Sequence, residues 1–185
     1  AGDCVLGRLD VRPALDGVED GLLHLRWLEG RGIRVLNRAD ALLACHDKLQ
    51  TALRLGRLGL PQPATVHVDD GAPVPRIAFP VVVKPAVKVR FMRVTRAKAW
   101  RADTRADLHA LFQKACAIVP AGEAMVQELI PGGGDRQYAY CAFFKDGAAV
   151  ASMAARRLRQ HPWEFGRAST FVETVDEAGL VEHST

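Results

Sequence analysis

The stretch from Phe79 to Ala86 constrains the fold more than any other part of the chain. It reads Phe-Pro-Val-Val-Val-Lys-Pro-Ala, and its three β-branched residues in a row show no alternation of apolar and polar side chains. Such a run is typical of a strand buried on both faces, as in mixed or parallel sheets. Lys84 follows at the carboxyl end of this strand, where Pro85 has no N–H with which to continue the ladder.

The place of Lys84 raises the question of its partner. An ammonium group is costly to bury without an anion beside it, and open sheets bind their ligands at the carboxyl ends of their strands. In the alternative, the aliphatic stem of Lys84 lies along the strand end and its ammonium reaches water. The sequence therefore predicts either an anion site or a solvated lysine at this point.

The composition is that of an ordinary globular protein. Of 185 residues, 49% are hydrophobic and 25% charged, which argues against a disordered or fibrous chain. No apolar run approaches the roughly 20 residues that span a bilayer, and the net charge of +4 suits a polyanionic ligand without requiring nucleic acid. The cysteines are far apart and form no Cys-x-x-Cys pair, which argues against a zinc site or disulfide framework and favours reduced thiols in a cytoplasmic protein: Cys4, Cys45, Cys116 and Cys141.

The spacing of the apolar segments predicts an α/β fold. Residues 4–11 and 33–36 are expected to form a parallel pair of strands, joined by a helix over residues 22–28. Asn37 is expected to cap the next helix, and Asp47 the one after it. We further expect a helix over 106–119, strands over 64–68, 124–130 and 169–175, and a hairpin of 138–144 with 148–155 around Asp146-Gly147. A basic loop is expected over 88–101, and irregular connections over 69–78 and 160–167.

Four segments stand in a fixed order along the chain: Asp47-Lys48, Leu60–Pro63, Phe79–Lys84 and Val126–Gly132. Together they resemble the ATP-grasp superfamily across nearly the whole chain, and within it the predicted ATP-grasp carboxylate–amine ligases. Residues 156–166 and 170–174 are similar to the segments after the hairpin in that group. Residues 35–48 also resemble the front of amino-acid ligases that attach glutamate to protein or peptide termini.

The resemblance implies how the fold is divided. Residues 1–40 would be the last β-α-β of a pre-ATP-grasp domain, residues 41–127 the nucleotide lobe, and residues 128–185 the first half of a second lobe. The chain would then be a truncated segment of a longer ligase and inactive by itself. The full enzyme would use ATP to activate a carboxylate as an acyl-phosphate, which an amine or similar nucleophile then attacks.

The resemblance also implies a nucleotide site built on two lysines. Lys48 would contact the phosphates, and Lys84 the α-phosphate and the edge of the adenine. A lysine in the first turn of a helix interacts unfavourably with the helix dipole, by roughly 0.3–1 kcal/mol. With a phosphate bound at that end, the lysine would instead attract the phosphate and stabilise its binding. The alternative for Lys48 is a solvated lysine paired with Asp47.

The other implied site residues each have a structural alternative. Glu128, Leu129 and Ile130 would form the interlobe hinge that reads the adenine, with Glu128 either accepting from its amino group or serving the fold alone. Asp135 would bind the ribose or be a turn residue. Arg157 and Arg159, which simple alternation places on one strand face with Arg156 on the other, would reach the acyl-phosphate or γ-phosphate, or else keep an edge strand solvated.

Two departures from the family pattern stand out. The segment 86–101, where the family has a glycine-rich phosphate loop, contains no glycine, and its basic side chains would replace that loop, form a mobile lid or bind another polyanion: Lys88, Arg90, Arg93, Arg96 and Lys98. Asn37 is the only asparagine, so the acid-x-Asn pattern that binds Mg²⁺ is absent. Glu173, Asp176, Glu177 and Glu182 do not match it, and the Mg²⁺ ligands are expected beyond residue 185.

Three functions remain open at this point. The first is the ATP-binding segment of a ligase, with ATP and a small carboxylate or amino acid as partners and a homo-oligomer allowed. The second is a non-catalytic nucleotide-binding or regulatory module without a metal site. The third and weakest is a nucleic-acid-binding protein that uses residues 88–101, which carry only two aromatic side chains among their basic residues.

Overall fold

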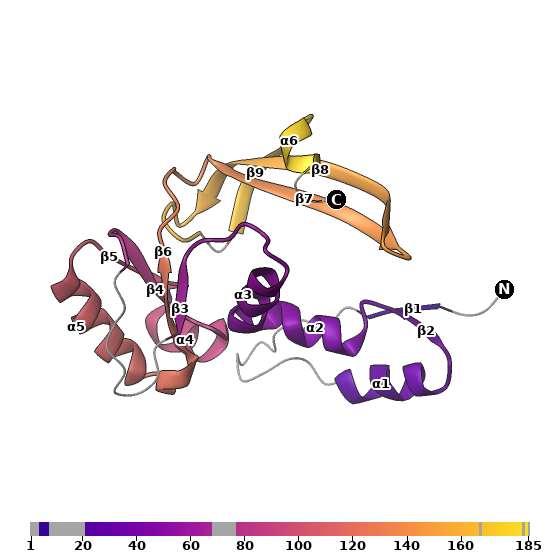
Figure 1. Cartoon of the computed structure of the whole chain (residues 1–185), viewed down its shortest axis with the longest axis horizontal. Helices are drawn as coiled ribbons and strands as arrows, with labels where there is room; N and C mark the ends of the chain where they lie inside the picture. Colours follow the sequence, from indigo (N-terminus) through magenta and orange to yellow (C-terminus); the bar gives the residue numbers. More distant parts are fainter. Residues whose placement is uncertain (1–3, 8–20, 68–76, 167, 183, 185) are drawn as a thin grey trace. The chain divides into compact units, whose positions relative to one another are not determined.

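The computed structural model describes residues 4–7, 21–67, 77–166, 168–182 and 184. The chain forms two compact units, residues 1–129 and residues 130–185 (Figure 1), which are described separately below. The connection expected over 69–78 and the end of the strand expected over 4–11 lie largely outside the described residues. No helix in the described ranges is long and apolar enough to cross a membrane.

The first unit begins with the predicted β-α-β arrangement. Strand β1 (Cys4–Leu6) pairs in parallel with β2 (Arg34–Leu36), and α1 (Leu22–Gly30) connects them. The apolar residues of this part pack around Leu25, Val35 and Ala39, all buried. The parallel pair predicted from the sequence is therefore confirmed.

The two caps predicted for the next helices have different outcomes. Helix α2 (Ala39–His46) is preceded by Arg38 as N-cap, and Asn37 adopts a left-handed conformation with φ 56°, so the cap predicted at Asn37 is wrong. Helix α3 (Lys48–Arg57) has the predicted cap. The Asp47 Oδ1 accepts the backbone N–H of Leu49 at 2.9 Å and that of Gln50 at 3.1 Å. Lys48 is consequently the first residue of α3.

The main sheet of the first unit is antiparallel. Its strands are β3 (Thr65–His67), β6 (Ala124–Glu128), β4 (Val81–Pro85) and β5 (Trp100–Ala102), in that order. The strand predicted at Val81–Val83 is buried on both faces, with no side chain there more than 5% exposed. Its burial is confirmed, but the mixed or parallel setting is wrong, because both of its neighbours run antiparallel to it.

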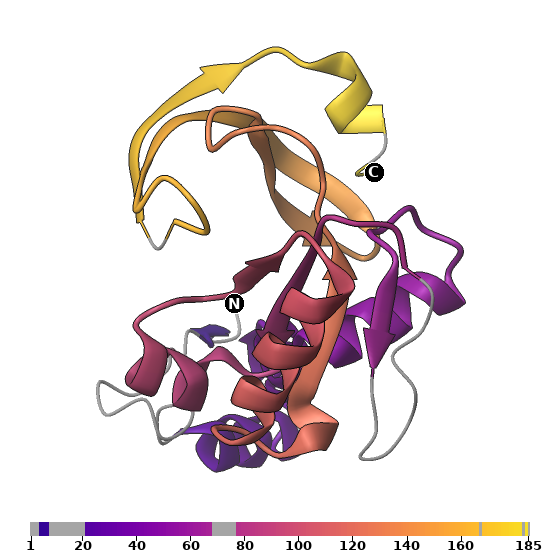
Figure 2. The same ribbon diagram turned by 90° about the vertical axis from the view of Figure 1, so that its left-hand side faces the viewer.

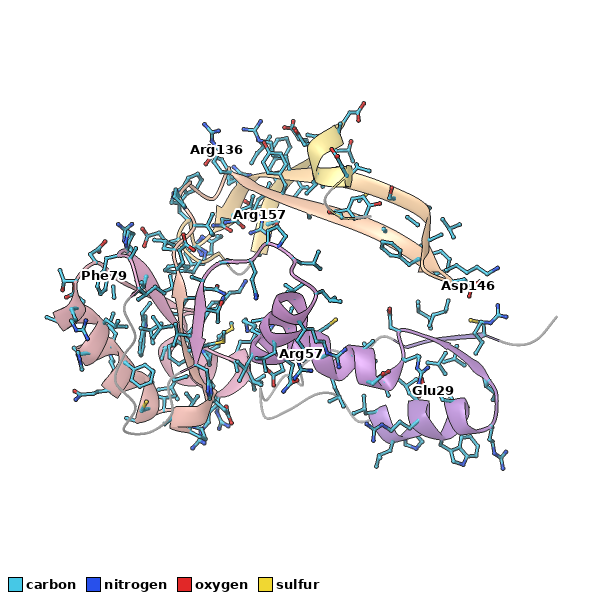
Figure 3. All side chains as sticks on the ribbon, in the orientation of Figure 1. Glu29, Arg57, Phe79, Arg136, Asp146 and Arg157 are labelled. Atoms are coloured by element: carbon cyan, nitrogen blue, oxygen red, sulfur yellow. The ribbon has the colours of Figure 1, made fainter. Side chains whose placement is uncertain are left out.

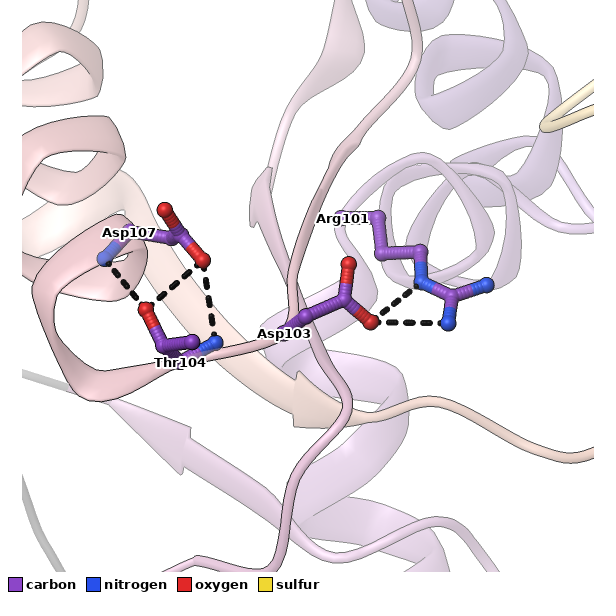
Figure 4. A network of polar contacts seen from close by, with 4 residues as sticks. All are labelled: Arg101, Asp103, Thr104 and Asp107. Atoms are coloured by element: carbon purple, nitrogen blue, oxygen red, sulfur yellow. Dashed lines mark hydrogen bonds and ion pairs between the residues drawn. The ribbon is translucent and has the colours of Figure 1, made fainter.

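Helix α5 (Arg105–Cys116) covers one face of this sheet and contacts β4, β5 and β6 (Figures 1 and 2). Its start is fixed by a capping box, in which Thr104 Oγ1 accepts the N–H of Asp107 at 3.1 Å and Asp107 Oδ2 accepts the N–H of Thr104 at 3.0 Å (Figure 4). Leu108 and Ala115 on its inner face join the sheet residues Val81 and Val83 in one core. The short connection from β5 and the capping box at Thr104 thus fix the start of α5, and its apolar face packs against β4.

The basic segment after β4 is not a loop. Residues Lys88–Thr95 form helix α4, which ends where Arg96 takes a left-handed conformation with φ 59°. Val89 and Phe91 are buried, and the Phe91 ring lies 4.5 Å from the Trp100 ring, centroid to centroid. The absence of glycine explains the difference, because a chain without glycine can complete a helical turn here and bury its apolar side chains.

The second unit is a sheet with the order β7-β8-β9, all antiparallel. It consists of β7 (Gln137–Lys145), β8 (Ala148–His161) and β9 (Ala168–Val175), followed by the short helix α6 (Ala178–Glu182). The predicted hairpin turn is confirmed, since Asp146 and Gly147 both have positive φ values, 51° and 82°. Asp146 lies at the tip of this hairpin (Figure 3). Strand β8 runs on to His161, into the range 160–167 that was expected to be irregular.

Gln160 holds the end of β8 in place. It is 6% exposed, its Nε2 donates to the carbonyl of Trp163, and its Oε1 accepts from Arg157 Nη1 at 2.7 Å. Two glycines pack directly on this side chain: a Cβ added at Gly134 would lie 2.7 Å from its Nε2, and one added at Gly166 would lie 2.5 Å from its Cδ. Gly134 and Gly166 have no Cβ, and the space this leaves is filled by the buried amide of Gln160.

Gly166→Ala should therefore lower the free energy of unfolding by about 1–3 kcal/mol, because the new methyl overlaps a side chain that its hydrogen bonds hold in place. Gly179→Ala is the matched control, since a Cβ there meets no atom within 4 Å. Thermal denaturation of the three proteins measures the difference. Equal loss in both variants would show that the contact with Gln160 has no special role.

Candidate functional site

The start of α3 is joined to the exit of β4. The backbone N–H of Lys48 donates to the carbonyl of Ala86 at 3.1 Å, and Lys48 Nζ donates to the same oxygen at 3.4 Å. Lys84 lies two residues before Ala86, at the end of the buried strand. The two lysines predicted to act together thus lie around one residue, although they are far apart in sequence.

Lys84 has a polar partner that sequence reasoning missed. The register of β4 and β6 places Gln127 opposite Val82 and on the same sheet face as Lys84, whose Nζ donates to Gln127 Oε1. Gln127 Nε2 in turn donates to Thr65 Oγ1 at 2.6 Å. A row of hydrogen bonds across three strands therefore fixes the direction of the Lys84 side chain.

The surroundings of Lys48 and Lys84 disfavour the charged form of both side chains. The pKa of Lys48 is lowered from 10.5 to about 8, first by burial and then by the positive charges of Lys84, Lys88 and Lys98, against the opposing effect of Asp47. Burial also lowers the pKa of Lys84. Three lysines act on Lys48, and the nearby carboxylate of Asp47 is already used as a helix cap. An anionic ligand would relieve this strain.

The predicted hinge residues serve the sheet. Glu128 Oε2 accepts the N–H of Ala64 at 3.1 Å, and the Glu128 N–H donates to the Ala64 carbonyl at 2.8 Å. The Leu129 N–H donates to the Pro80 carbonyl at 3.2 Å. Glu128 lies opposite Val81, which places its side chain on the sheet face that Lys84 does not occupy. These contacts match the structural alternative for Glu128.

Asp135 lies in a tight turn of the second unit. The N–H of Arg136 donates to the Gly133 carbonyl at 3.0 Å, which closes the turn around Asp135. The Asp135 carbonyl accepts from Arg156 Nε at 3.4 Å. The position is that of the turn residue that the sequence left as an alternative.

The arginines of β8 do not alternate simply. The register between β8 and β9 shifts between Arg157 and Arg159 and again between Arg159 and Gln160. The prediction that Arg157 and Arg159 share one face by simple alternation is therefore wrong, because a β-bulge inserts a residue and turns the side chains that follow. Each arginine contacts a different group: Arg156 lies 4.0 Å from Glu173, Arg157 donates to Gln137 and Gln160, and Arg159 donates to Thr170 at 3.1 Å.

Comparison with solved structures decides the fold, while no protein-family model matches the sequence. D-alanine–D-alanine ligase from Bacillus anthracis, complexed with ATP, superposes with a TM-score of 0.59 at 18% identity, over 97% of this chain and 56% of the ligase. An ATP-grasp RimK domain protein from Sphaerobacter thermophilus gives 0.53 at 17% identity, over 89% of this chain and 57% of that one. This chain has an ATP-grasp fold.

A third match extends the comparison to another ligase. L-amino acid ligase from Bacillus licheniformis gives a TM-score of 0.57 at 14% identity, over 88% of this chain and 37% of that protein. The chain thus spans from about a third to somewhat over half the length of these three structures. The ATP-grasp fold predicted from the order of the motifs is confirmed.

Metal-ligating side chains do not gather in the described part of this chain. Among those residues, no group of three or more histidine, cysteine, aspartate or glutamate side chains could hold a metal ion. The described residues therefore do not fit a complete Mg²⁺ site.

Proposed function

We propose that this chain is the ATP-binding segment of a ligase that activates a carboxylate as an acyl-phosphate for attack by an amine. The observation that carries the proposal is that Lys48 contacts Ala86, two residues after Lys84, with both lysines partly buried and the charge of Lys84 acting on Lys48. The D-alanine–D-alanine ligase and the L-amino acid ligase that share the fold are named for amino-acid substrates. A small carboxylate or amino acid is the substrate class that this supports.

The proposed reaction has two steps. A carboxylate oxygen of the substrate attacks the γ-phosphorus of ATP, the bond from that phosphorus to the β,γ-bridging oxygen breaks, and ADP leaves. The amine then attacks the acyl carbon of the acyl-phosphate and loses a proton, and phosphate leaves. Lys48 and Lys84 would bind the phosphates and offset their charge, which is the main catalytic contribution available in phosphoryl transfer.

Further residues would contact the adenine, the ribose and the transferred phosphoryl group. The backbone of Glu128, Leu129 and Ile130 would contact the adenine, with the Glu128 and Leu129 carbonyls as acceptors, because their N–H groups already donate within the sheet. Asp135 would contact the ribose, and Arg157 or Arg159 the transferred phosphoryl group. Mg²⁺, where bound, would neutralise phosphate charge.

Titration calorimetry with ATP tests the proposal directly. Lys84→Ala should weaken ATP binding by about tenfold or more, since a hydrogen bond between charged groups contributes roughly 1.5–3 kcal/mol. Lys145→Ala is the matched control, because Lys145 is an exposed lysine in the β7–β8 hairpin of the second unit. Equal affinity in wild type and Lys84→Ala, or no binding by either, would refute the proposal.

The ligase part of the proposal needs a separate measurement. Release of ADP from ATP in the presence of amino acids and other carboxylates should depend on one substrate class. ATP binding with no ADP release for any carboxylate would instead identify a nucleotide-binding module without catalysis.

A further inference from the structure

Two helices of the first unit begin with a lysine at the same place. Lys48 is the first residue of α3 and Lys88 the first residue of α4. The backbone and the Nζ of Lys48 both donate to the carbonyl of Ala86, and Lys88 follows Ala86 by two residues, after the N-cap Val87. Lys84 lies two residues before Ala86, so one lysine contacts this residue and two others lie within two positions of it along the chain.

This arrangement is unfavourable without a ligand. The start of a helix carries a partial positive charge, so a lysine at the first position is the wrong charge for the dipole. Helix α4 has no acidic residue in its first turn and no side-chain cap to compensate. The nearby acid Asp47 is engaged, since its Oδ1 accepts the N–H groups of Leu49 and Gln50. The charges of Lys84 and Lys88 also act on Lys48 and lower its pKa.

The chain around Lys88 limits how it can contact an anion. Beyond its first turn a helix uses its backbone N–H groups internally, so α4 offers a ligand the Lys88 ammonium and its first N–H groups. Val89 and Phe91 are buried, and Phe91 packs in the core with the sheet residues Val81 and Val83. The segment therefore presents Lys88 from a fixed position and cannot wrap a phosphate with its main chain.

We propose that Lys88 is a third phosphate ligand of this site, so that a triphosphate is held mainly by the side chains of Lys48, Lys84 and Lys88. The inference rests on the proposed function, and it names the polyphosphate part of the nucleotide as what the cluster recognises. A triphosphate carries more charge than a single phosphate and spans more of the cluster. Inorganic tripolyphosphate should consequently compete with ATP, whereas AMP should bind far more weakly.

The basic side chains of α4 offer a matched control. Arg93 is exposed and lies on the same helix. The charge of Lys88 is one of those that lower the pKa of Lys48, and Arg93 lies five residues further along the chain. Arg93→Gln therefore removes the same net charge from α4 as Lys88→Gln does, at an exposed position in the last turn of the helix.

The experiment titrates ATP and inorganic tripolyphosphate into wild type, Lys88→Gln and Arg93→Gln at two salt concentrations. Lys88→Gln should weaken both ligands by about tenfold and reduce the salt dependence of binding, while Arg93→Gln should stay within about twofold of wild type. The melting temperature of Lys88→Gln should not fall below that of wild type, because the substitution removes an unfavourable charge from a helix start.

The outcomes separate this inference from the proposed function. Wild type that binds ATP while Lys88→Gln binds it equally well overturns the role of Lys88 and leaves the ATP site standing. Equal losses in Lys88→Gln and Arg93→Gln also overturn it, since they would report only a diffuse positive field. Wild type that binds neither ligand refutes both proposals.

Discussion

Replacing Lys48 with methionine should make the first unit more stable and its nucleotide binding weaker. Methionine fills the space of the aliphatic stem without a charge, and removing a poorly compensated buried charge is often stabilising. A fall in pKa from 10.5 to about 8 corresponds to roughly 3 kcal/mol before solvent screening. Because the side chain is only partly buried, we expect a gain of about 1–2 kcal/mol in the free energy of unfolding at pH 7.

The pH dependence of this gain distinguishes the charge from the packing. The folded-state pKa of Lys48 is about 8, below the 10.5 of the unfolded chain. Between these values the unfolded state binds the proton that the folded state has lost, so the wild type gains stability as pH rises from about 8 to 10.5. The advantage of Lys48→Met should therefore be constant below pH 8 and shrink above it, as measured by urea denaturation at several pH values.

Two results would contradict this account of Lys48. A Lys48→Met protein that is less stable than wild type at pH 7 would mean that the contact of Nζ with the Ala86 carbonyl outweighs the burial of the charge. An advantage that stays the same up to pH 10 would assign the gain to packing alone. ATP affinity should be measured in the same variant. If Lys48 serves ligand binding at the expense of stability, Lys48→Met should both stabilise the protein without ligand and weaken its binding of ATP.

Local signals in the sequence were sufficient for much of this site. The unbroken run Val81–Val83 predicted a buried strand, and Asp47 predicted a helix start, so the two lysines beside them could be placed on their elements. The turn at Asp146-Gly147 was equally local. Each of these features is set by residues within a few positions of one another.

The parts that could not be predicted depend on contacts distant in sequence. Gln127 is recognisable as the partner of Lys84 only once the register of β6 against β4 is known. The shift of register beside Arg157 cannot be seen in the residues of β8 alone, because a bulge is defined against the partner strand. The sequence also left the role of Glu128 open between adenine binding and a structural role. Its partner Ala64 is 64 positions away in sequence, so their contact could not be predicted from the residues around Glu128.

Helix α4 is the segment where the sequence was most misleading, and Phe91→Ala tests its role. Phe91 has no exposed surface and packs with Val81 and Val83 in the core beneath the sheet. Truncating it should lower the free energy of unfolding by about 3–5 kcal/mol, through lost burial and the cavity left behind. Chemical denaturation followed by circular dichroism measures the loss. Val94→Ala on the same helix is the control, with an expected change within about 0.5 kcal/mol because Val94 is 63% exposed.

The size of that difference decides between two accounts of the basic segment. A large loss for Phe91→Ala alone means that α4 is part of the core, so that Lys88 is presented from a rigid helix and the positive charge near Lys84 is preorganised for a ligand. If Phe91→Ala lowers the free energy of unfolding by less than about 1 kcal/mol, α4 is only weakly attached to the core and behaves as a lid. In that case the positions of the charges would be set by the ligand rather than by the fold, and the same substitution would alter ATP affinity more than stability.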